Sequence, residues 1–170
     1  GASRTLELQE EGMATARLRD SDLRNAMKDS LDAYASGKEA FFDFLADDVR
    51  VYTLESSEPM LGRKAFQKYF GPTFARIKRT VELVAEDVQS AGELAAIGAR
   101  TIQVTSEGVS VAVRQTIVWD KSSGQWRMSH IHNAFAGQPI AVGKMPKTAR
   151  GIRVLNERIA TVAATVGVAQ

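Results

Sequence analysis

The chain has no cysteine among its 170 residues, which excludes disulfide bonds and thiol chemistry. An absence of cysteine suits a reducing compartment, so we expect a cytoplasmic protein. No uninterrupted apolar run approaches the roughly 18 residues of a membrane span. Residues 1–11 also lack the apolar core of a signal peptide. The sequence therefore predicts no membrane partner.

Clustered charge of one sign is also missing. Lysine and arginine total 22, aspartate and glutamate total 20, and no run of five or more basic residues occurs. A protein that binds nucleic acid usually shows a basic stripe, so we expect no nucleic-acid partner. Hydrophobic residues make up 44% and charged residues 25%, as in ordinary globular domains. At this length one main domain is expected.

Helical patterns fill the first quarter of the chain. Residues 4–19 are charged and rich in helix formers, which predicts a helical arm. Ser21 and Asp22 are typical of a helix N-terminus. One helix face follows at steps of four, four and three, formed by Leu23, Met27, Leu31 and Tyr34. Gly37 ends this helix, and a short aromatic helix is predicted at 39–46.

Strand patterns dominate the middle of the chain. Extended segments are predicted at 49–54, 79–88, 94–105, 109–119 and 126–135. A helix is predicted at 63–70 and is interrupted by Gly71 and Pro72. Helices followed by a long antiparallel meander are typical of the α+β class.

The last segment of the chain, residues 137–170, is predicted to form a loop followed by a helix. An apolar stripe at helical spacing contains Ile152, Leu155, Ile159, Val162 and Val166. It is too short for an independent coiled coil, so it packs on its own domain, on a partner subunit or over a pocket. We divide the chain into a helical arm (1–20), an α+β domain (21–136) and a C-terminal loop and helix (137–170).

Strand alternation sorts the side chains into two faces. Arg100 falls among apolar neighbours on segment 94–105, and a buried guanidinium needs a partner. Gln115 is the polar exception on the apolar face of 109–119, whereas Arg114 lies on the opposite face. On the last strand, Ser129, Ile131, Asn133 and Phe135 share one side, and Met128, His130 and His132 share the other.

His130 and His132 are the only histidines in the chain. Two imidazoles on one strand face can chelate a metal ion. No carboxylate occupies a matching position on that strand, so we predict no metal site and no cofactor.

Three stretches of the chain match a known family. F-L-A-D-D-V-R-V-Y (44–52), P-M-L-G-R-K-A-F (59–66) and W-R-M-S-H-I-H-N-A-F (126–135) resemble the SnoaL-like branch of the nuclear transport factor 2 superfamily. The last stretch is similar to the association (hub) domain of calcium/calmodulin-dependent kinase II. The resemblance implies a cone-shaped barrel of a strongly bent antiparallel sheet, with helices on its concave side and N- and C-terminal helical extensions. It also implies a pocket between sheet and helices, and a homodimer through the sheet or a larger homo-oligomer.

The two best-known relatives differ in the residues that they place in this pocket. The hub domains carry three pocket arginines, whose positions correspond here to Arg100, Ile117 and Asn133, so one arginine is retained. The ketosteroid isomerases carry a catalytic aspartate, whose position corresponds to Thr53. A threonine cannot act as a base near neutral pH, so the resemblance disfavours that chemistry.

The sequence thus predicts a small-molecule-binding domain whose pocket suits a small carboxylate or carbonyl compound. The candidate ligand-binding residues are Arg100, Gln115, Asn133, Ser129, Tyr52 and Tyr34. Three alternatives stay open: a non-catalytic oligomerisation module, a cofactor-free isomerase, cyclase or dehydratase, and an Arg100 that only pairs with an internal acid. The candidate acids are Asp43, Asp47 and Glu55.

Overall fold

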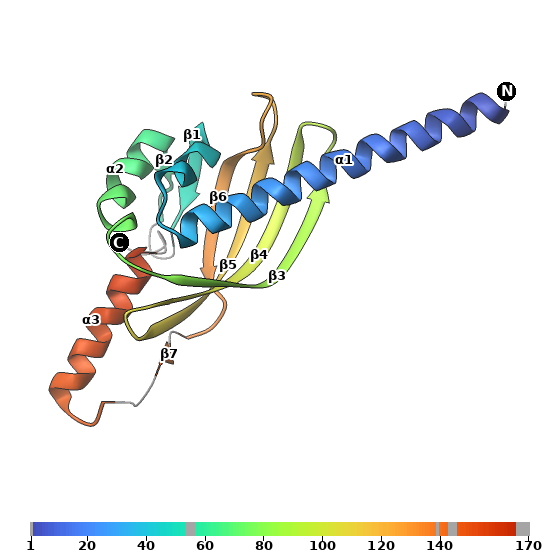
Figure 1. The fold of residues 1–170 in the computed structure, drawn as a ribbon. Helices are drawn as coiled ribbons and strands as arrows, with labels where there is room; N and C mark the ends of the chain where they lie inside the picture. Colours follow the sequence, from blue (N-terminus) through green and yellow to red (C-terminus); the bar gives the residue numbers. More distant parts are fainter. Residues whose placement is uncertain (1, 54–56, 139, 143–145, 166–170) are drawn as a thin grey trace.

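A strongly curved sheet forms the centre of the computed structural model, which describes residues 2–53, 57–138, 140–142 and 146–165 (Figure 1). The strand order is β2-β1-β6-β5-β4-β3, with β7 paired to β5. The strands are β1 (Leu45–Tyr52), β2 (Met60–Leu61), β3 (Thr80–Ser90), β4 (Ala95–Ser106), β5 (Val109–Asp120), β6 (Arg127–Phe135) and β7 (Ile140–Ala141). The four long strands predicted from alternation are confirmed to within two residues at each end. The first strand begins four residues earlier than predicted.

The α+β class and the cone shape are confirmed, with two differences in the sheet. β1 runs parallel to β6, whereas the other pairs are antiparallel, so the sheet is mixed. The sheet ends at β2 and β3 and does not close into a barrel. β1 and β6 are far apart in the sequence, so no hairpin forces them into an antiparallel pair.

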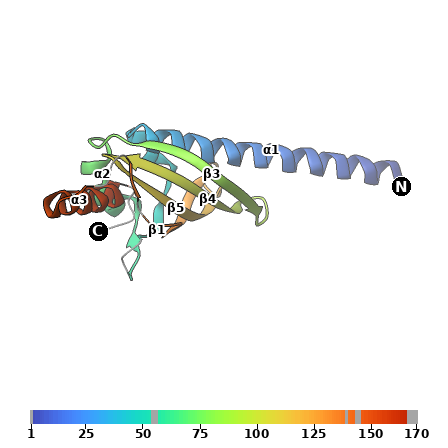
Figure 2. The same cartoon turned by 90° about the horizontal axis from the view of Figure 1, so that it is seen from below.

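The first helix, α1 (Ala2–Ala35), is longer than predicted. The predicted helix start at Ser21 and Asp22 is wrong, because the helix continues through both residues. No proline interrupts residues 2–35, and the chain before Ser21 consists mostly of helix formers. The second half of α1 lies across the concave face of the sheet, and the first half continues beyond the sheet (Figures 1 and 2).

Aromatic side chains from two helices fill much of the space under the sheet. The 3-10 helix η1 (Glu39–Phe44) buries Phe41 and Phe42. Helix α2 (Arg63–Phe74) buries Phe66, Phe70 and Phe74, which recur every four residues along one face. The predicted interruption at Gly71 and Pro72 is wrong. Pro72 lies in the last turn of α2, and its missing N–H removes one helical hydrogen bond without ending the helix.

Trp119 on β5 is fully buried because β4 leaves space for it. A Cβ atom added to Gly98 would lie 3.0 Å from Trp119 Nε1 and 3.0 Å from Met27 Cε. Gly98 therefore lets the α1 side chains and the indole pack directly on the β4 backbone. The β4–β5 turn also needs glycine-like geometry, since Glu107 and Gly108 have φ values of 51° and 78°.

One strand face is assigned differently by the structure. The β5–β6 register shifts between Val118 and Trp119, so a bulge lies beside Ser129. Met128 is buried on the inner face, and the hydroxyl of Ser129 donates to the carbonyl of Val118. The prediction that Met128 shares a side with His130 is therefore wrong. Alternation cannot reveal a bulge.

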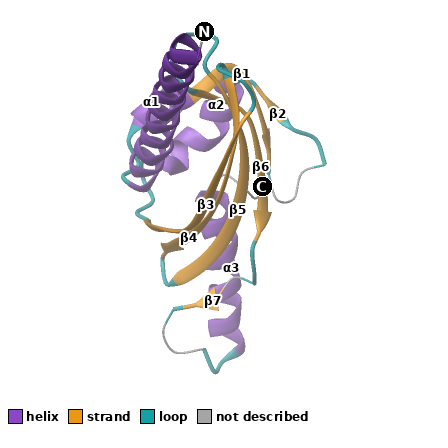
Figure 3. Ribbon diagram, turned by 90° about the vertical axis from the view of Figure 1, so that its right-hand side faces the viewer, coloured by secondary structure: helices purple, strands orange, loops and turns teal. Residues whose placement is uncertain are grey.

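The C-terminal helix α3 (Ala149–Thr165) lies beyond one end of the sheet (Figure 3). Leu155 and Ile159 pack against the core, whereas Ile152 is 48% exposed. The predicted stripe is thus used partly within its own domain, and Val166 lies outside the described residues. Among the helices that the structure describes, none combines the length and hydropathy that a membrane crossing requires.

Candidate functional site

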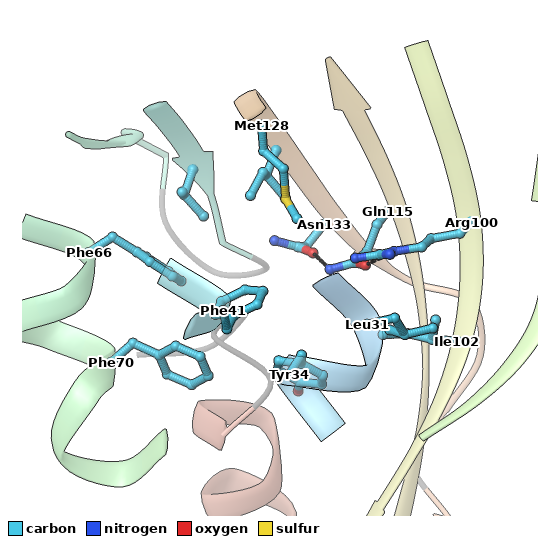
Figure 4. Close-up of a pocket in the computed structure, with 12 residues that line it drawn as sticks. Leu31, Tyr34, Phe41, Phe66, Phe70, Arg100, Ile102, Gln115, Met128 and Asn133 are labelled. Atoms are coloured by element: carbon cyan, nitrogen blue, oxygen red, sulfur yellow. Dashed lines mark hydrogen bonds between the residues drawn. The ribbon is translucent and has the colours of Figure 1, made fainter. Parts of the chain in front are cut away.

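Arg100 points into the protein interior, as strand alternation predicts. It is 4% exposed, and its strand neighbours on the same face, Ile102 and Val104, are also buried. Arg114 on β5 is exposed on the opposite face, which confirms that prediction. Arg100 is therefore the charged group that β4 places under the sheet (Figure 4).

The acceptors of Arg100 are neutral. Its Nε donates to Gln115 Oε1 at 2.8 Å, and its Nη1 donates to the carbonyl of Met27 at 3.1 Å and to Ser30 Oγ at 3.5 Å. The alternative of an internal acid is wrong for Asp43 and Asp47, since Arg100 forms no ion pair within the described part of the chain. Glu55, the third acid considered, lies outside the described residues.

A fixed chain of hydrogen bonds leads away from Arg100. Gln115 Nε2 donates to Asn133 Oδ1 at 2.9 Å, and Asn133 Nδ2 donates to the carbonyl of Tyr52 at 3.1 Å. A guanidinium only donates, so the orientation of both amides follows from Arg100. Among the described residues, each amide nitrogen makes only one of its two possible donations, so each amide has a second N–H that could bind a ligand.

A small cavity borders this chain. Polar side chains line it together with apolar ones from α1, η1, α2 and the sheet: Leu31, Tyr34, Phe41, Val51, Phe66, Phe70, Arg100, Ile102, Gln115, Met128, Ile131 and Asn133 (Figure 4). Its volume is about 20 Å³, measured as space for the centre of a water-sized sphere. That is room for about one water molecule, so the aromatic rings fill most of the hollow.

Burial changes the acidity of both titratable groups in the cavity wall. Loss of hydration lowers the pKa of Arg100 to about 10, against the opposing effects of Glu86 and Tyr34. Burial also raises the pKa of Tyr34. Both groups are therefore protonated at neutral pH. The described wall presents hydrogen-bond donors and one positive charge, and it holds no carboxylate or imidazole that could act as a base.

The other predicted site residues lie elsewhere. Tyr52 and Ser129 do not line the cavity. The ring of Tyr52 stacks on His130 at 5.3 Å and lies 5.9 Å from His132, on the outer side of the sheet. Thr53, at the position of the isomerase base, is buried, and its hydroxyl has no hydrogen-bond partner in the described structure. Within the described ranges, three or more histidine and acidic side chains do not gather into a metal-binding group.

Two contributors to the site were not predicted from the sequence. Met128 enters the cavity only because of the bulge in β6. Ser30, fully buried on α1, contributes a hydroxyl beside Nη1 of Arg100. A signal for Ser30 was present, since this serine lies three residues after Met27, next to the apolar face of the helix.

Solved structures share this fold at low sequence identity. A candidate scytalone dehydratase from Novosphingobium aromaticivorans has a TM-score of 0.68 and 11% identity, over 78% of this chain and 93% of that chain. A type 2 hexachlorocyclohexane dehydrochlorinase has a TM-score of 0.64 and 13% identity, over 79% of this chain and 99% of that chain. The CamKII hub homology domain of Chlamydamonas reinhardtii has a TM-score of 0.57 and 21% identity, over 69% of this chain and 98% of that chain. These likenesses show the fold and not the activity.

Sequence comparison identifies the family. No curated protein matches the chain significantly. The family profile described as the SnoaL-like domain matches residues 23–137, from the sheet-facing half of α1 to the end of β6. This match covers more than half of the chain and includes every described residue that lines the cavity. The protein therefore belongs to the SnoaL-like domain family.

Proposed function

We propose that the protein binds a small molecule with a carboxylate or carbonyl group at Arg100. The observation that carries this proposal is a guanidinium at 4% exposure whose acceptors are all neutral. Glu86 offsets only part of the cost of burying this charge, since it is itself paired with Arg24 and the pKa of Arg100 is still lowered; an anionic ligand would offset more of that cost. Nη2 of Arg100 donates to no described residue. It is also not completely enclosed by other atoms. It is thus available to a ligand.

The same wall favours binding over proton transfer. Chemistry next to a carbonyl group requires a base that is unprotonated at neutral pH. Tyr34 and Arg100, the titratable groups in the described wall, both keep their protons. A donor-rich cavity instead suits recognition of an oxygen with negative charge, as charge-assisted hydrogen bonds are the strong ones.

The ligand is larger than the cavity in this closed form. Small-molecule pockets usually enclose about 300–1,000 Å³. Binding therefore requires lining side chains to move, and the rotatable side chains of Leu31 and Phe41 are the ones that we expect to give way.

Replacing Arg100 with methionine tests the proposal. We expect acetate to bind the wild-type protein and the affinity to fall at least about 10-fold in Arg100→Met, because a charge-assisted hydrogen bond is lost. Isothermal titration calorimetry measures this change. Arg114→Met is the matched control, since Arg114 is an exposed arginine on the adjacent strand. Equal acetate affinity in Arg100→Met and wild type would refute the proposal.

The pH dependence provides a second readout of the same site. Only protonated Arg100 carries the charge, so acetate affinity should stay level between pH 7 and 9 and fall above the pKa of about 10. The pKa of Arg100 in the folded protein lies below that of an exposed arginine. Burial of charged Arg100 thus lowers stability below pH 10, and this cost disappears as the pH rises above about 10 towards the pKa of an exposed arginine.

A second candidate function is assembly, in agreement with the hub-domain likeness. The convex face of the sheet carries partly or fully exposed side chains at adjacent positions: Ile97, Ala99, Thr116, Val118, Tyr52, His130 and His132. A homodimer through this face would bury them. The first half of α1, which continues beyond the sheet, offers a second surface for such a contact (Figure 1).

Ile97→Asp tests the dimer. Ile97 is 40% exposed, so the variant should fold, but it would place a charge within the proposed interface. We expect light scattering to give a dimer mass for the wild type and a monomer mass for Ile97→Asp. Val154→Asp, at a 36% exposed position on α3, should remain dimeric. A monomeric wild type would rule out this second function.

A further inference from the structure

A larger groove lies next to the Arg100 cavity. It runs between α1 and the edge strand β3 and has a volume of about 480 Å³. Its apolar lining comes from Met27 and Leu31 on α1 and from Val81 and Leu83 on β3. Leu83 is 45% exposed, although its backbone partner Ile102 on β4 is buried. The volume falls within the range of pockets that hold small organic ligands.

Leu31 separates the groove from the Arg100 cavity. Its half-buried side chain lines both spaces. Met27 lines the groove, and its carbonyl accepts the hydrogen bond from Arg100 Nη1. The guanidinium thus lies directly behind the groove wall. A change of rotamer at Leu31 would join the two spaces into one site with a charged end and an apolar end.

The charges along the groove are balanced. Arg24 on α1 pairs with Glu86 on β3 at 3.1 Å, and Lys28 pairs with Asp32 at 2.8 Å. These pairs leave no net charge to attract a charged tail. Glu86 is also the backbone partner of Arg100, so its carboxylate lies on the inner face near the path to the guanidinium. A second carboxylate on the ligand would find no unpaired cation among the described residues that line the groove.

We propose that the ligand of the Arg100 site is an aliphatic monocarboxylate whose alkyl tail lies in the α1–β3 groove. This inference rests on the proposed function and adds the class of ligand. The carboxylate displaces the side chain of Leu31 and accepts hydrogen bonds from Arg100, while the tail covers Leu83 and Val81. The groove extends along α1 from Arg24 to Ala35, roughly 16 Å at 1.5 Å per residue, which accommodates a medium-length chain.

A chain-length series tests the inference on the full chain. Straight-chain monocarboxylates from acetate to octanoate are titrated into the wild-type protein by calorimetry. Each added methylene should raise the affinity roughly 4-fold until the groove is filled, because each buried methylene contributes about 0.8 kcal/mol. Suberate, the eight-carbon dicarboxylate, should bind at least about 10-fold more weakly than octanoate, since its second charge would lie on an apolar lining.

Two variants on one strand locate the tail. Leu83→Asp should bring octanoate affinity down to about that of acetate, because it places a charge beside the tail. Val84→Asp is the matched control: Val84 is the next residue, is 59% exposed and does not line the groove, so octanoate affinity should not change. Both substitutions are at exposed positions, and circular dichroism verifies that each variant folds.

The outcomes separate this inference from the proposed function. Suppose that acetate and octanoate bind the wild type equally well and that Arg100→Met binds neither. This result would refute binding of the tail in the groove, but it would support binding of the carboxylate at Arg100. If Leu83→Asp binds octanoate as tightly as the wild type, binding of the tail in the groove would also be refuted. If no monocarboxylate binds the wild-type protein, both proposals fail.

Discussion

Arg79→Ala is expected to lower the free energy of unfolding by about 3 kcal/mol, because one guanidinium satisfies the ends of two helices. Nη1 donates to the carbonyl of Tyr34 at 2.7 Å, in the last turn of α1, and Nη2 donates to the carbonyl of Phe74, the last residue of α2. The guanidinium carbon also lies 5.1 Å from the ring centre of Tyr34 and 4.8 Å from that of Phe74. Truncation would leave two helix-terminal carbonyls buried without these donors.

The expected loss in the free energy of unfolding is smaller than the sum of two full charge-assisted hydrogen bonds. Burial lowers the pKa of Arg79, so the wild-type protein already bears a cost for enclosing the charge, and truncation removes that cost. Urea denaturation measures the change. Arg76→Ala is the matched control, an exposed arginine three residues earlier, and should change stability by less than about 0.5 kcal/mol. Stability of Arg79→Ala within the same limit would contradict the role as a double cap.

Phe70→Ala is expected to have the largest effect on stability, a loss of about 3–5 kcal/mol. The ring is 1% exposed and lies 5.1 Å from the ring of Phe74, 5.3 Å from Phe66 and 6.3 Å from Phe42. Removing it from this cluster leaves a void that fixed neighbours cannot fill. Chemical denaturation provides the measurement. Tyr69→Ala, at a 39% exposed position on the same helix, should cost less than about 1.5 kcal/mol.

The same variant also tests the cavity. Phe70 lines the space next to Arg100, so its removal adds room for an aromatic ring beside the guanidinium. Benzoate should therefore raise the melting temperature of Phe70→Ala more than that of the wild type, since a ligand that binds the native state stabilises it. The gain should disappear in the double variant Phe70→Ala/Arg100→Met. A gain of equal size in the double variant would show that Arg100 does not hold the carboxylate.

Strand alternation was the most informative signal in the sequence. It placed Arg100 and Gln115 inside and Arg114 outside, because β4 and β5 pair without a bulge along their whole length. The same rule failed on β6, where Ser129 is an extra, unpaired residue that moves Met128 to the inner face. Tyr52 contributes its carbonyl to the polar chain, and no argument from residue type reveals a backbone acceptor.

Helix ends were predicted less well than strands. Ser21 and Asp22 are residue types that often begin a helix. Such a residue marks the start of a helix only where the chain before it is not helical. Residues 2–20 remain helical, so α1 is continuous. The C-terminal stripe left three packing partners open, and the partner became evident only when Leu155 and Ile159 were placed against the core.

The sequence by itself determined the α+β class, the order of the long strands, the inward direction of Arg100 and the family, since all of these follow from local periodicity and short motifs. Only the tertiary structure decided what surrounds Arg100. Its acceptors come from residues as distant in the chain as Met27, and the phenylalanines that narrow the cavity come from two other helices. Whether a buried charge meets a carboxylate, a carbonyl or open space depends on packing between remote segments. Local pattern carries no information about such packing.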